Sequence, residues 1–319
     1  MEACRQFLMN MGSKPDCSEF IESFKKHDRG AMQDREEDPK CVKVAIIDNG
    51  ADKFQYPICD SIERGISYVT ADNDSTDRVL PWWMVSDPHG TQMASLVREA
   101  NPWCQLYIAR VGKGRRDILP EDAAQAIKWA IEQKVDIISI SWVIKSKVTQ
   151  LEEAIKSAVQ NGILVFCSTA DTGTGSGSVY PAYYKGTVQV SATDKYGNLM
   201  PSADKGTHAV NIPVPGEDIP AVGPSYMSDA VAEGTVSGSS VATALAAGMA
   251  SLSLLLLMVF NNKDKQALKS EGLYENEKMG KLLSVAINTP GDTEPLFPNA
   301  AKINDLPRRW KLSAIKANI

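Results

Sequence analysis

The sequence lacks the close pairs of cysteines or histidines, CxxC and HxxxH, that supply the ligands of most protein zinc sites. Its six cysteines are scattered along 319 residues without short paired spacings, which favours free thiols in a reducing compartment over a disulfide framework. The N-terminal residues also lack the sustained apolar run of a secretory signal. We therefore expect a cytoplasmic protein with no metal site and no cofactor.

Positive charge is in short supply. The chain has 34 Lys and Arg against 39 Asp and Glu, a formal net charge of −5. A nucleic-acid-binding protein needs clustered Lys and Arg to neutralise phosphates, and only the segment GKGRR at 112–116 comes close. We expect that segment to be a solvated loop, and we expect no nucleic acid among the partners.

One long segment lacks charge altogether. Residues 235–260 contain no charged side chain, and the stretch 241–260 is long enough to span a membrane. A membrane-anchored protein is therefore one alternative. A helix that is apolar on all sides can equally be the central buried helix of a large α/β domain, and the many alanines after Gly238 suit close packing there. We favour the core helix and expect no membrane partner.

Short β-branched runs alternate with amphipathic segments along the chain. Strands are predicted at 41–48, 105–111, 135–141, 163–168 and 187–193, and helices at 119–134, 149–162 and 275–288. The helix at 149–162 carries a predicted capping box, Thr149 to Glu152. This rhythm predicts a three-layer αβα fold with a mostly parallel central sheet covered on both faces. We divide the chain into a polar leader, 1–40, and one domain, 41–319, whose tail from 261 is the least informative part.

Histidine is scarce, which makes the search for a catalytic base short. The chain has three: His27 in the charged leader, His208 in a turn-like segment, and His89. Only His89 opens a segment with helical apolar periodicity, at 89–97. At the N-terminus of a helix the dipole disfavours the imidazolium, which keeps the imidazole neutral and basic.

Three segments that contain an Asp, a His and a Ser follow one another along the chain in that order. VAIIDNG at 44–50, HGTQMASLV at 89–97 and GSSVATALAAG at 238–248 resemble the three catalytic motifs of the subtilisin-like serine peptidases, which follow one another as Asp, His, Ser. The resemblance extends over about residues 42–260, through VPGEDI at 214–219 and YPAYYKGTVQVSATD at 180–194.

The resemblance implies a subtilisin-like fold and a serine endopeptidase. Ser240 attacks the scissile carbonyl and forms an acyl-enzyme, His89 acts as the general base, and Asp48 orients the imidazole. The substrate implied is a protein or peptide in an extended conformation, bound by strand addition. The chain is also compatible with being the catalytic part of a larger protein with further domains.

Each of these residues has a plainer interpretation when taken alone. An Asp at the end of a strand is more often a turn residue, and a Ser at the start of a helix is more often a cap. The three motifs in order outweigh these interpretations together. Ser239 is the rival nucleophile, although the family pattern G-T-S places a threonine-like residue there. Asp52 is the rival acid, although Asp48 ends the strand directly.

The segment TADTG departs from the A-G-N pattern whose Asn supplies an oxyanion donor in the family. Asp171 takes the place of that Asn, and an ionised carboxylate only accepts hydrogen bonds. Asp171 can therefore help only when it is protonated, a form that burial favours by raising the pKa of a carboxyl group. Thr172 is a second candidate donor.

The segment SWVI, Ser141 to Ile144, replaces the usual S-L-G-G of the substrate-binding edge. We expect Ser141, Trp142 and Val143, with Gly238 and Ser239, to line the substrate site. Trp142 has two alternatives, because it either narrows the pocket or packs into the core.

Three further departures bear on regulation and on metal binding. The segment after the His89 helix is too short for the loop that holds a calcium ion in many relatives. The leader is shorter than the pro-region of secreted members, and Gln92 replaces the second His of H-G-T-H, which together fit an intracellular lineage. The main alternative to an enzyme is a pseudopeptidase or peptide-binding regulatory module, which Asp171 and SWVI motivate.

Overall fold

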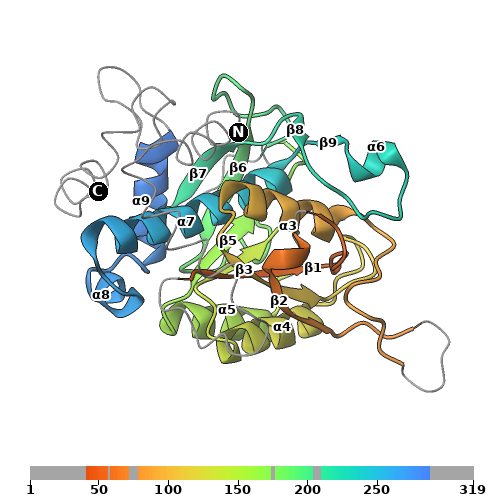
Figure 1. Ribbon diagram of the computed structural model, residues 1–319, viewed down its shortest axis with the longest axis horizontal. Helices are drawn as coiled ribbons and strands as arrows, with labels where there is room; N and C mark the ends of the chain where they lie inside the picture. Colours follow the sequence, from red (N-terminus) through yellow and green to blue (C-terminus); the bar gives the residue numbers. More distant parts are fainter. Residues whose placement is uncertain (1–40, 57, 72–77, 174–176, 204–209, 288–319) are drawn as a thin grey trace.

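A computed structural model of the chain describes residues 41–56, 58–71, 78–173, 177–203 and 210–287. The predicted leader, His27, His208 and the tail after Ile287 lie outside these ranges. Seven strands form one sheet in the order β2-β3-β1-β4-β5-β6-β7, and every pair of neighbours is parallel (Figure 1). The strands are β1 (Lys43–Asp48), β2 (Ile62–Ser67), β3 (Gln105–Arg110), β4 (Ile137–Ile140), β5 (Leu164–Ser168), β6 (Val188–Thr193) and β7 (Asn211–Pro215).

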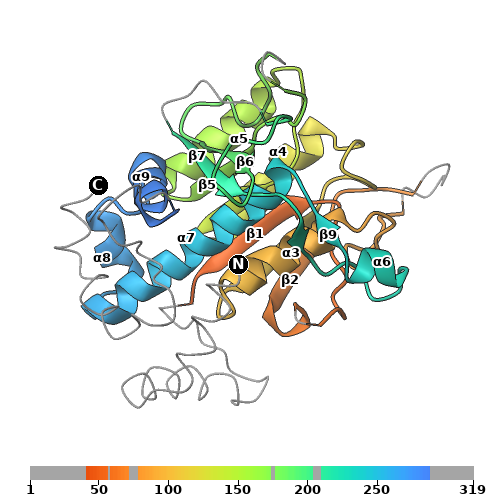
Figure 2. The same ribbon diagram turned by 90° about the horizontal axis from the view of Figure 1, so that it is seen from above.

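Helices cover both faces of the sheet, which confirms the predicted three-layer fold. One face carries α3 (His89–Ala100), α7 (Ser239–Asn261), α8 (Lys265–Ser270) and α9 (Asn276–Ile287). The other face carries α4 (Pro120–Glu132) and α5 (Thr149–Gln160). Figure 2 shows α3 and α7 side by side along the first face. Three short elements lie in the connections, η1 (Cys59–Ser61), α6 (Asp229–Ala232) and the antiparallel pair of β8 (Ile219–Pro220) with β9 (Thr235–Val236).

The central strands are buried on both faces. In β1, Val44 and Ile46 belong to the core under α3 and α7, whereas Ala45 and Ile47 belong to the core under α4 and α5. This explains why the sequence of β1 is a continuous apolar run rather than an alternating one. The strand order reverses beside β1, because the chain adds β2 and β3 on one side of β1 and β4 to β7 on the other. Such a switch point is a place where α/β folds bind ligands.

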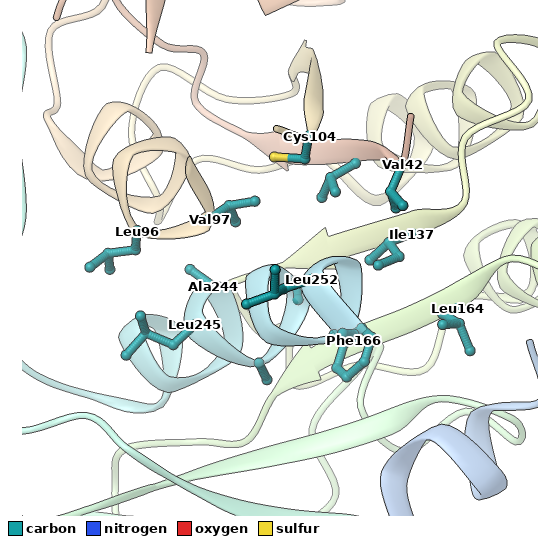
Figure 3. Close-up of a cluster of buried hydrophobic side chains, with 14 of the residues drawn as sticks. Val42, Leu96, Val97, Cys104, Ile137, Leu164, Phe166, Ala244, Leu245 and Leu252 are labelled. Carbon is teal, nitrogen blue, oxygen red and sulfur yellow. The ribbon is translucent and has the colours of Figure 1, made fainter. Parts of the chain in front are cut away.

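Helix α7 is the core helix of the domain. Among the described residues it is the one helix long and apolar enough to cross a membrane, and 83% of its most apolar window is buried inside the protein. Figure 3 shows Ala244, Leu245 and Leu252 of α7 among Val97 of α3 and Phe166 of β5. This burial accounts for the apolar composition of 241–260 without a membrane.

Helices α3 and α7 cross at very short range. A Cβ atom added to Gly248 of α7 would lie 2.6 Å from Ala100 Cβ and 2.9 Å from the carbonyl oxygen of Val97. Glycine therefore allows the backbones to approach each other at this crossing.

The leucine-rich end of α7 has a partner in the segment that follows it. Leu254 and Leu256 are fully buried, in the same core as Leu268 of α8 and Leu282 of α9. A buried aspartate adds a polar tie, since Asp136 accepts hydrogen bonds from Lys43 N at 2.8 Å, Lys265 Nζ at 2.7 Å and Tyr274 Oη at 3.0 Å. Residues 261–287 thus pack on the same core as the sheet.

The structure corrects one predicted feature and adds elements that were not predicted, among them α8 and two strands of the sheet. The predicted capping box is wrong, because Thr149 is already the first residue of α5 and no side chain caps this helix; Glu152 instead pairs with Lys147 at 2.9 Å. Strands β2 and β7 were not predicted. Both lie at edges of the sheet, where burial is mixed, and β7 contains two prolines, which an edge strand tolerates.

Candidate active site

A buried aspartate and a buried histidine meet at the end of the central strand. Asp48 is the last residue of β1 and His89 is the first residue of α3. The imidazole Nδ1 of His89 lies 2.9 Å and 3.0 Å from the two carboxylate oxygens of Asp48. Because both of these carboxylate oxygens are acceptors, the imidazole proton stays on Nδ1. Nε2 therefore keeps its lone pair and can accept a proton. Nε2 is buried, and no described residue hydrogen-bonds to it.

Ser240 lies on the wall of the same cavity as His89. The cavity has a volume of about 440 Å³ and its lining includes Asp87, His89, Arg115, Ser237 and Ser240. Ser240 is the second residue of α7, directly after Gly238 and Ser239. Gly238 has φ of +133°, a backbone conformation that side chains rarely allow. A Cβ atom at Gly238 would lie 2.7 Å from Asp171 Oδ2 and 3.7 Å from Ser240 Oγ, so the missing side chain leaves room beside Ser240.

The rival residues are engaged elsewhere. Ser239 is buried and its hydroxyl donates to the carbonyl oxygen of Thr169 at 2.6 Å. Asp52 accepts hydrogen bonds from the backbone N–H and the hydroxyl of Ser225, at 3.0 and 2.7 Å. The structure therefore brings Asp48 to His89 and places the side chain of Ser240, rather than that of Ser239, on the cavity.

The carboxylate of Asp171 lies at the start of α7. Both of its oxygens are 3.0 Å from the backbone nitrogen of Ser239, which donates to them. Burial of this carboxyl group raises the pKa of Asp171, while the Ser239 hydrogen bonds and the positive charge of Arg115 act in the opposite direction. Here Asp171 acts as an acceptor. A protonated carboxyl group can accept from Ser239 with one oxygen and donate from the other. Asp171 as a whole residue is exposed, as is the neighbouring Thr172.

The predicted substrate edge divides into core and surface. Trp142 is buried, with 4% of its surface exposed, and its indole N–H donates to the carbonyl oxygen of Ile47 at 2.8 Å. Of the two alternatives for Trp142 the core position is therefore found, and its side chain does not line the pocket. The hydroxyl of Ser141 donates to the carbonyl oxygen of Ser240 at 3.1 Å. Ile144 pairs with Tyr180 through its backbone. Val143, between Trp142 and Ile144, is half-buried.

The arrangement agrees with a comparison of the whole chain with known families. Residues 40–270 match the Subtilase family, Peptidase_S8. The chain belongs to the subtilase family. The intracellular serine protease of Paenibacillus polymyxa is 30% identical to this subtilase over 230 residues, 66% of the chain and 66% of that protein. The major intracellular serine protease of Bacillus subtilis (strain 168) is 29% identical over 198 residues, 56% of the chain and 59% of that protein. The chain thus spans about 59% to 66% of the length of these two relatives.

Solved structures show the same fold as this subtilase. The prenylagaramide maturation protease PagA superposes with a TM-score of 0.60 at 23% identity, covering 88% of this chain and 95% of that one. A cold adapted subtilisin-like serine proteinase superposes with a TM-score of 0.60 at 19% identity, covering 79% of this chain and 84% of that one. The fold is therefore a subtilisin-like three-layer α/β fold.

Sequence reasoning missed three polar residues around the site of this subtilase. Asp87 accepts the backbone N–H of His89 at 2.9 Å, and Asn49 accepts that of Gly90 at 2.8 Å. Arg115, from the segment expected to be a solvated loop, is exposed but lines the cavity. Asn49 lies within the motif of Asp48, and Asp87 stands two positions before the motif of His89, which is the one signal in the sequence that could have found them.

Metal binding has no candidate in the described part of this subtilase. No group of three or more His, Cys, Asp or Glu side chains within the described ranges could hold a metal ion.

Proposed function

We propose that this subtilase is a serine endopeptidase whose catalytic residues are Asp48, His89 and Ser240. The observation that carries the proposal is the buried Asp48–His89 pair opening onto the cavity that Ser240 lines. Membership of the subtilase family and the serine proteases among its relatives support the same activity.

The reaction follows from the order of these groups. His89 Nε2 takes the hydroxyl proton of Ser240 as the oxygen attacks the scissile carbonyl carbon, which gives a tetrahedral oxyanion. The carbon–nitrogen bond then breaks, and the proton passes from His89 to the leaving amine. A water molecule repeats the sequence on the acyl-enzyme, which releases the acid product and restores Ser240. The backbone N–H groups and the dipole at the start of α7 stabilise the oxyanion.

The substrate we propose is an extended peptide that adds a strand beside Trp142 and Val143. Among the described residues, the main chain of these two residues pairs with no other backbone segment. Their N–H and C=O groups can thus hydrogen-bond to a peptide backbone, which is how strand addition gives affinity. The side chain of Trp142 is buried below this edge.

We propose a cytoplasmic location for the protein and one peptidase domain over 41–319. The relatives with intracellular in their names support the location, and so do the free thiols of Cys41, Cys59, Cys104 and Cys167. The packing of α8 and α9 on α7 supports a domain that continues past residue 261.

A fluorophosphonate probe tests the activity, because it reacts with an activated serine hydroxyl. We expect labelling of the wild-type protein and no labelling of Ser240→Ala. Ser239→Ala is the matched control, since it removes a neighbouring hydroxyl that bonds to Thr169 and should leave the labelling in place. Labelling that survives in Ser240→Ala would refute the assignment of the nucleophile.

The second candidate function is a peptide-binding module with little turnover. The observation that favours it is the carboxylate of Asp171 at the start of α7, where the oxyanion would need stabilisation. This candidate predicts a folded wild-type protein that binds extended peptides but is neither labelled by the probe nor able to cleave them. Cleavage that depends on Ser240 would reject it.

A further inference from the structure

Asn49 carries a fully buried side-chain amide beside the Asp48–His89 pair. It follows Asp48 directly, none of its surface is exposed, and its backbone N–H donates to Asp48 Oδ1 at 2.8 Å. A buried amide is costly unless its donor and acceptor are both satisfied. The partners of Asn49 therefore indicate why it is there.

Both ends of the Asn49 side chain bond to the segment that carries His89. Its Nδ2 donates to the carbonyl oxygen of Asp87 at 3.1 Å, and its Oδ1 accepts the backbone N–H of Gly90 at 2.8 Å. These two residues flank His89, whose own N–H donates to the side chain of Asp87. One side chain thus ties the end of β1 to the chain on both sides of His89, which is 41 residues away from Asp48.

The contact between Asn49 and the start of α3 requires glycine at position 90. A Cβ atom on Gly90 would clash with the carbonyl oxygen of Gly50 and would lie 2.7 Å from Asn49 Oδ1. The start of α3 is therefore in direct backbone contact with the turn after β1. Asn49 also supplies an acceptor to one of the first N–H groups of α3, which have no partner within the helix.

We propose that Asn49 is a positioning residue that holds His89 in place against Asp48. Asn49 acts through these two residues rather than on the substrate, and the inference rests on their proposed role in catalysis. Without the Asn49 side chain, Asp87 and Gly90 lose their tie to β1 and the imidazole is free to shift. A displacement of about 1 Å in a catalytic group costs about 10²-fold in rate.

Asn101 offers a matched control on the same helix. It is also fully buried and follows the last residue of α3, at the end remote from His89. Its Nδ2 donates to Ser251 Oγ at 2.9 Å and its Oδ1 accepts the backbone N–H of Trp103 at 3.1 Å. Asn49→Ala and Asn101→Ala therefore each remove one buried amide with two hydrogen bonds, at opposite ends of α3.

The kinetic test compares the two variants with the wild-type protein. We expect Asn49→Ala to lower kcat for a peptide substrate by about 10²-fold with KM changed by less than about threefold, and Asn101→Ala to leave both unchanged per folded molecule. If Asn49→Ala does not fold, Asn49→Ser replaces it, because Ser keeps an uncharged polar group while its shorter side chain no longer reaches both Asp87 and Gly90; its kcat should fall in the same direction. Equal kcat values for the variants at positions 49 and 101 would overturn the proposal.

A second measurement does not depend on turnover. The proton on Nδ1 of His89, held by the carboxylate of Asp48, should give a low-field proton resonance, which His89→Gln assigns. We expect this resonance in the wild-type protein and in Asn101→Ala, and its loss through exchange with water in Asn49→Ala. An unchanged resonance in Asn49→Ala would overturn the inference. A wild-type protein that the fluorophosphonate does not label would count against the proposed function alone, because the resonance still decides the role of Asn49.

Discussion

Replacing Asp171 with Asn tests whether the carboxylate at the start of α7 limits catalysis. In the structure this carboxylate accepts the N–H of Ser239, the residue before the proposed nucleophile. In the proposed reaction the oxyanion of the tetrahedral intermediate forms beside Ser240 Oγ, so a negative charge on Asp171 repels it. Asn has nearly the same size, can still accept from Ser239, and adds an N–H donor. We expect Asp171→Asn to be faster than the wild-type protein at high pH.

The size of the effect follows from Coulomb's law. A carboxylate about 5 Å from an oxyanion, at an effective dielectric constant of about 20, raises its free energy by about 3 kcal/mol. Because Asp171 is an exposed residue, screening by water reduces this to about 1–3 kcal/mol, or about 10- to 10²-fold in rate. The new donor acts in the same direction, since removing one oxyanion donor from a serine protease costs about 10²- to 10³-fold.

The pH dependence gives the sign of the effect. Burial raises the pKa of Asp171, so its carboxyl group stays neutral to a higher pH than usual. Below that pKa the neutral wild-type side chain can itself donate, and the two proteins should be similar. Above it the carboxylate is charged, and the ratio of kcat/KM for the variant to that of the wild type should rise and then level off. Both proteins need a neutral His89, so this requirement cancels in the ratio.

Rates of fluorophosphonate labelling and of peptide hydrolysis, measured from below the ordinary Asp pKa of about 3.9 up to about pH 9, give this ratio. Arg115→Gln should move the rise to higher pH, because the positive charge of Arg115 lowers the pKa of Asp171. Thr172→Val is the control for pH dependence, since it removes the second candidate donor without changing charge, and its ratio to the wild type should not vary with pH. A ratio that is independent of pH, or an Asp171→Asn protein that is slower than the wild type throughout, would refute this reasoning.

Three further predictions concern the fold. Asp136→Asn replaces a buried acceptor of three hydrogen bonds and should lower the free energy of unfolding by about 2–3 kcal/mol in urea titrations, and no change would contradict its anchoring role. Gly248→Ala forces a Cβ atom against Ala100 and should cost about 1–3 kcal/mol, measured by thermal unfolding. Trp142→Phe loses the hydrogen bond to Ile47 and should lower the free energy of unfolding by about 1 kcal/mol, while KM for peptides stays the same. A changed KM would indicate that the Trp142 side chain contacts the substrate.

The sequence was most informative where burial is complete. Strands β1, β4 and β5 were predicted because both of their faces are buried, which leaves a continuous apolar run. Strands β2 and β7 lie at the edges, where solvent on one side removes that pattern. The capping box at α5 was wrong because the spacing of Thr149 and Glu152 does not fix where the helix begins.

In the candidate site, too, the sequence indicates residues that belong to a local pattern and misses those that depend on contacts between distant segments. Asp48, His89 and Ser240 could be proposed from the sequence because each stands at the end of a regular element within a motif. Asn49 was not, because its two hydrogen bonds join segments 38 and 41 residues apart, and no local pattern shows such a contact. Trp142 could not be assigned between pocket and core, since only the fold places its indole against Ile47.

Helix α7 connects Ser240, the proposed nucleophile, to the core, and this connection accounts for the composition of the helix. Its first turn presents Ser240 to the cavity, so the position of this hydroxyl is only as well defined as the helix behind it. That helix lies on the sheet, crosses α3 at Gly248, and ends beneath α8 and α9. Little of its circumference faces water, and the buried hydroxyls of Ser251 and Ser253 donate to carbonyl oxygens of the helix itself, at 2.7 and 2.8 Å. A charged side chain on any of these faces would be costly to bury. The uncharged run that satisfies the length criterion for a membrane span is therefore what a buried helix carrying a serine at its tip requires.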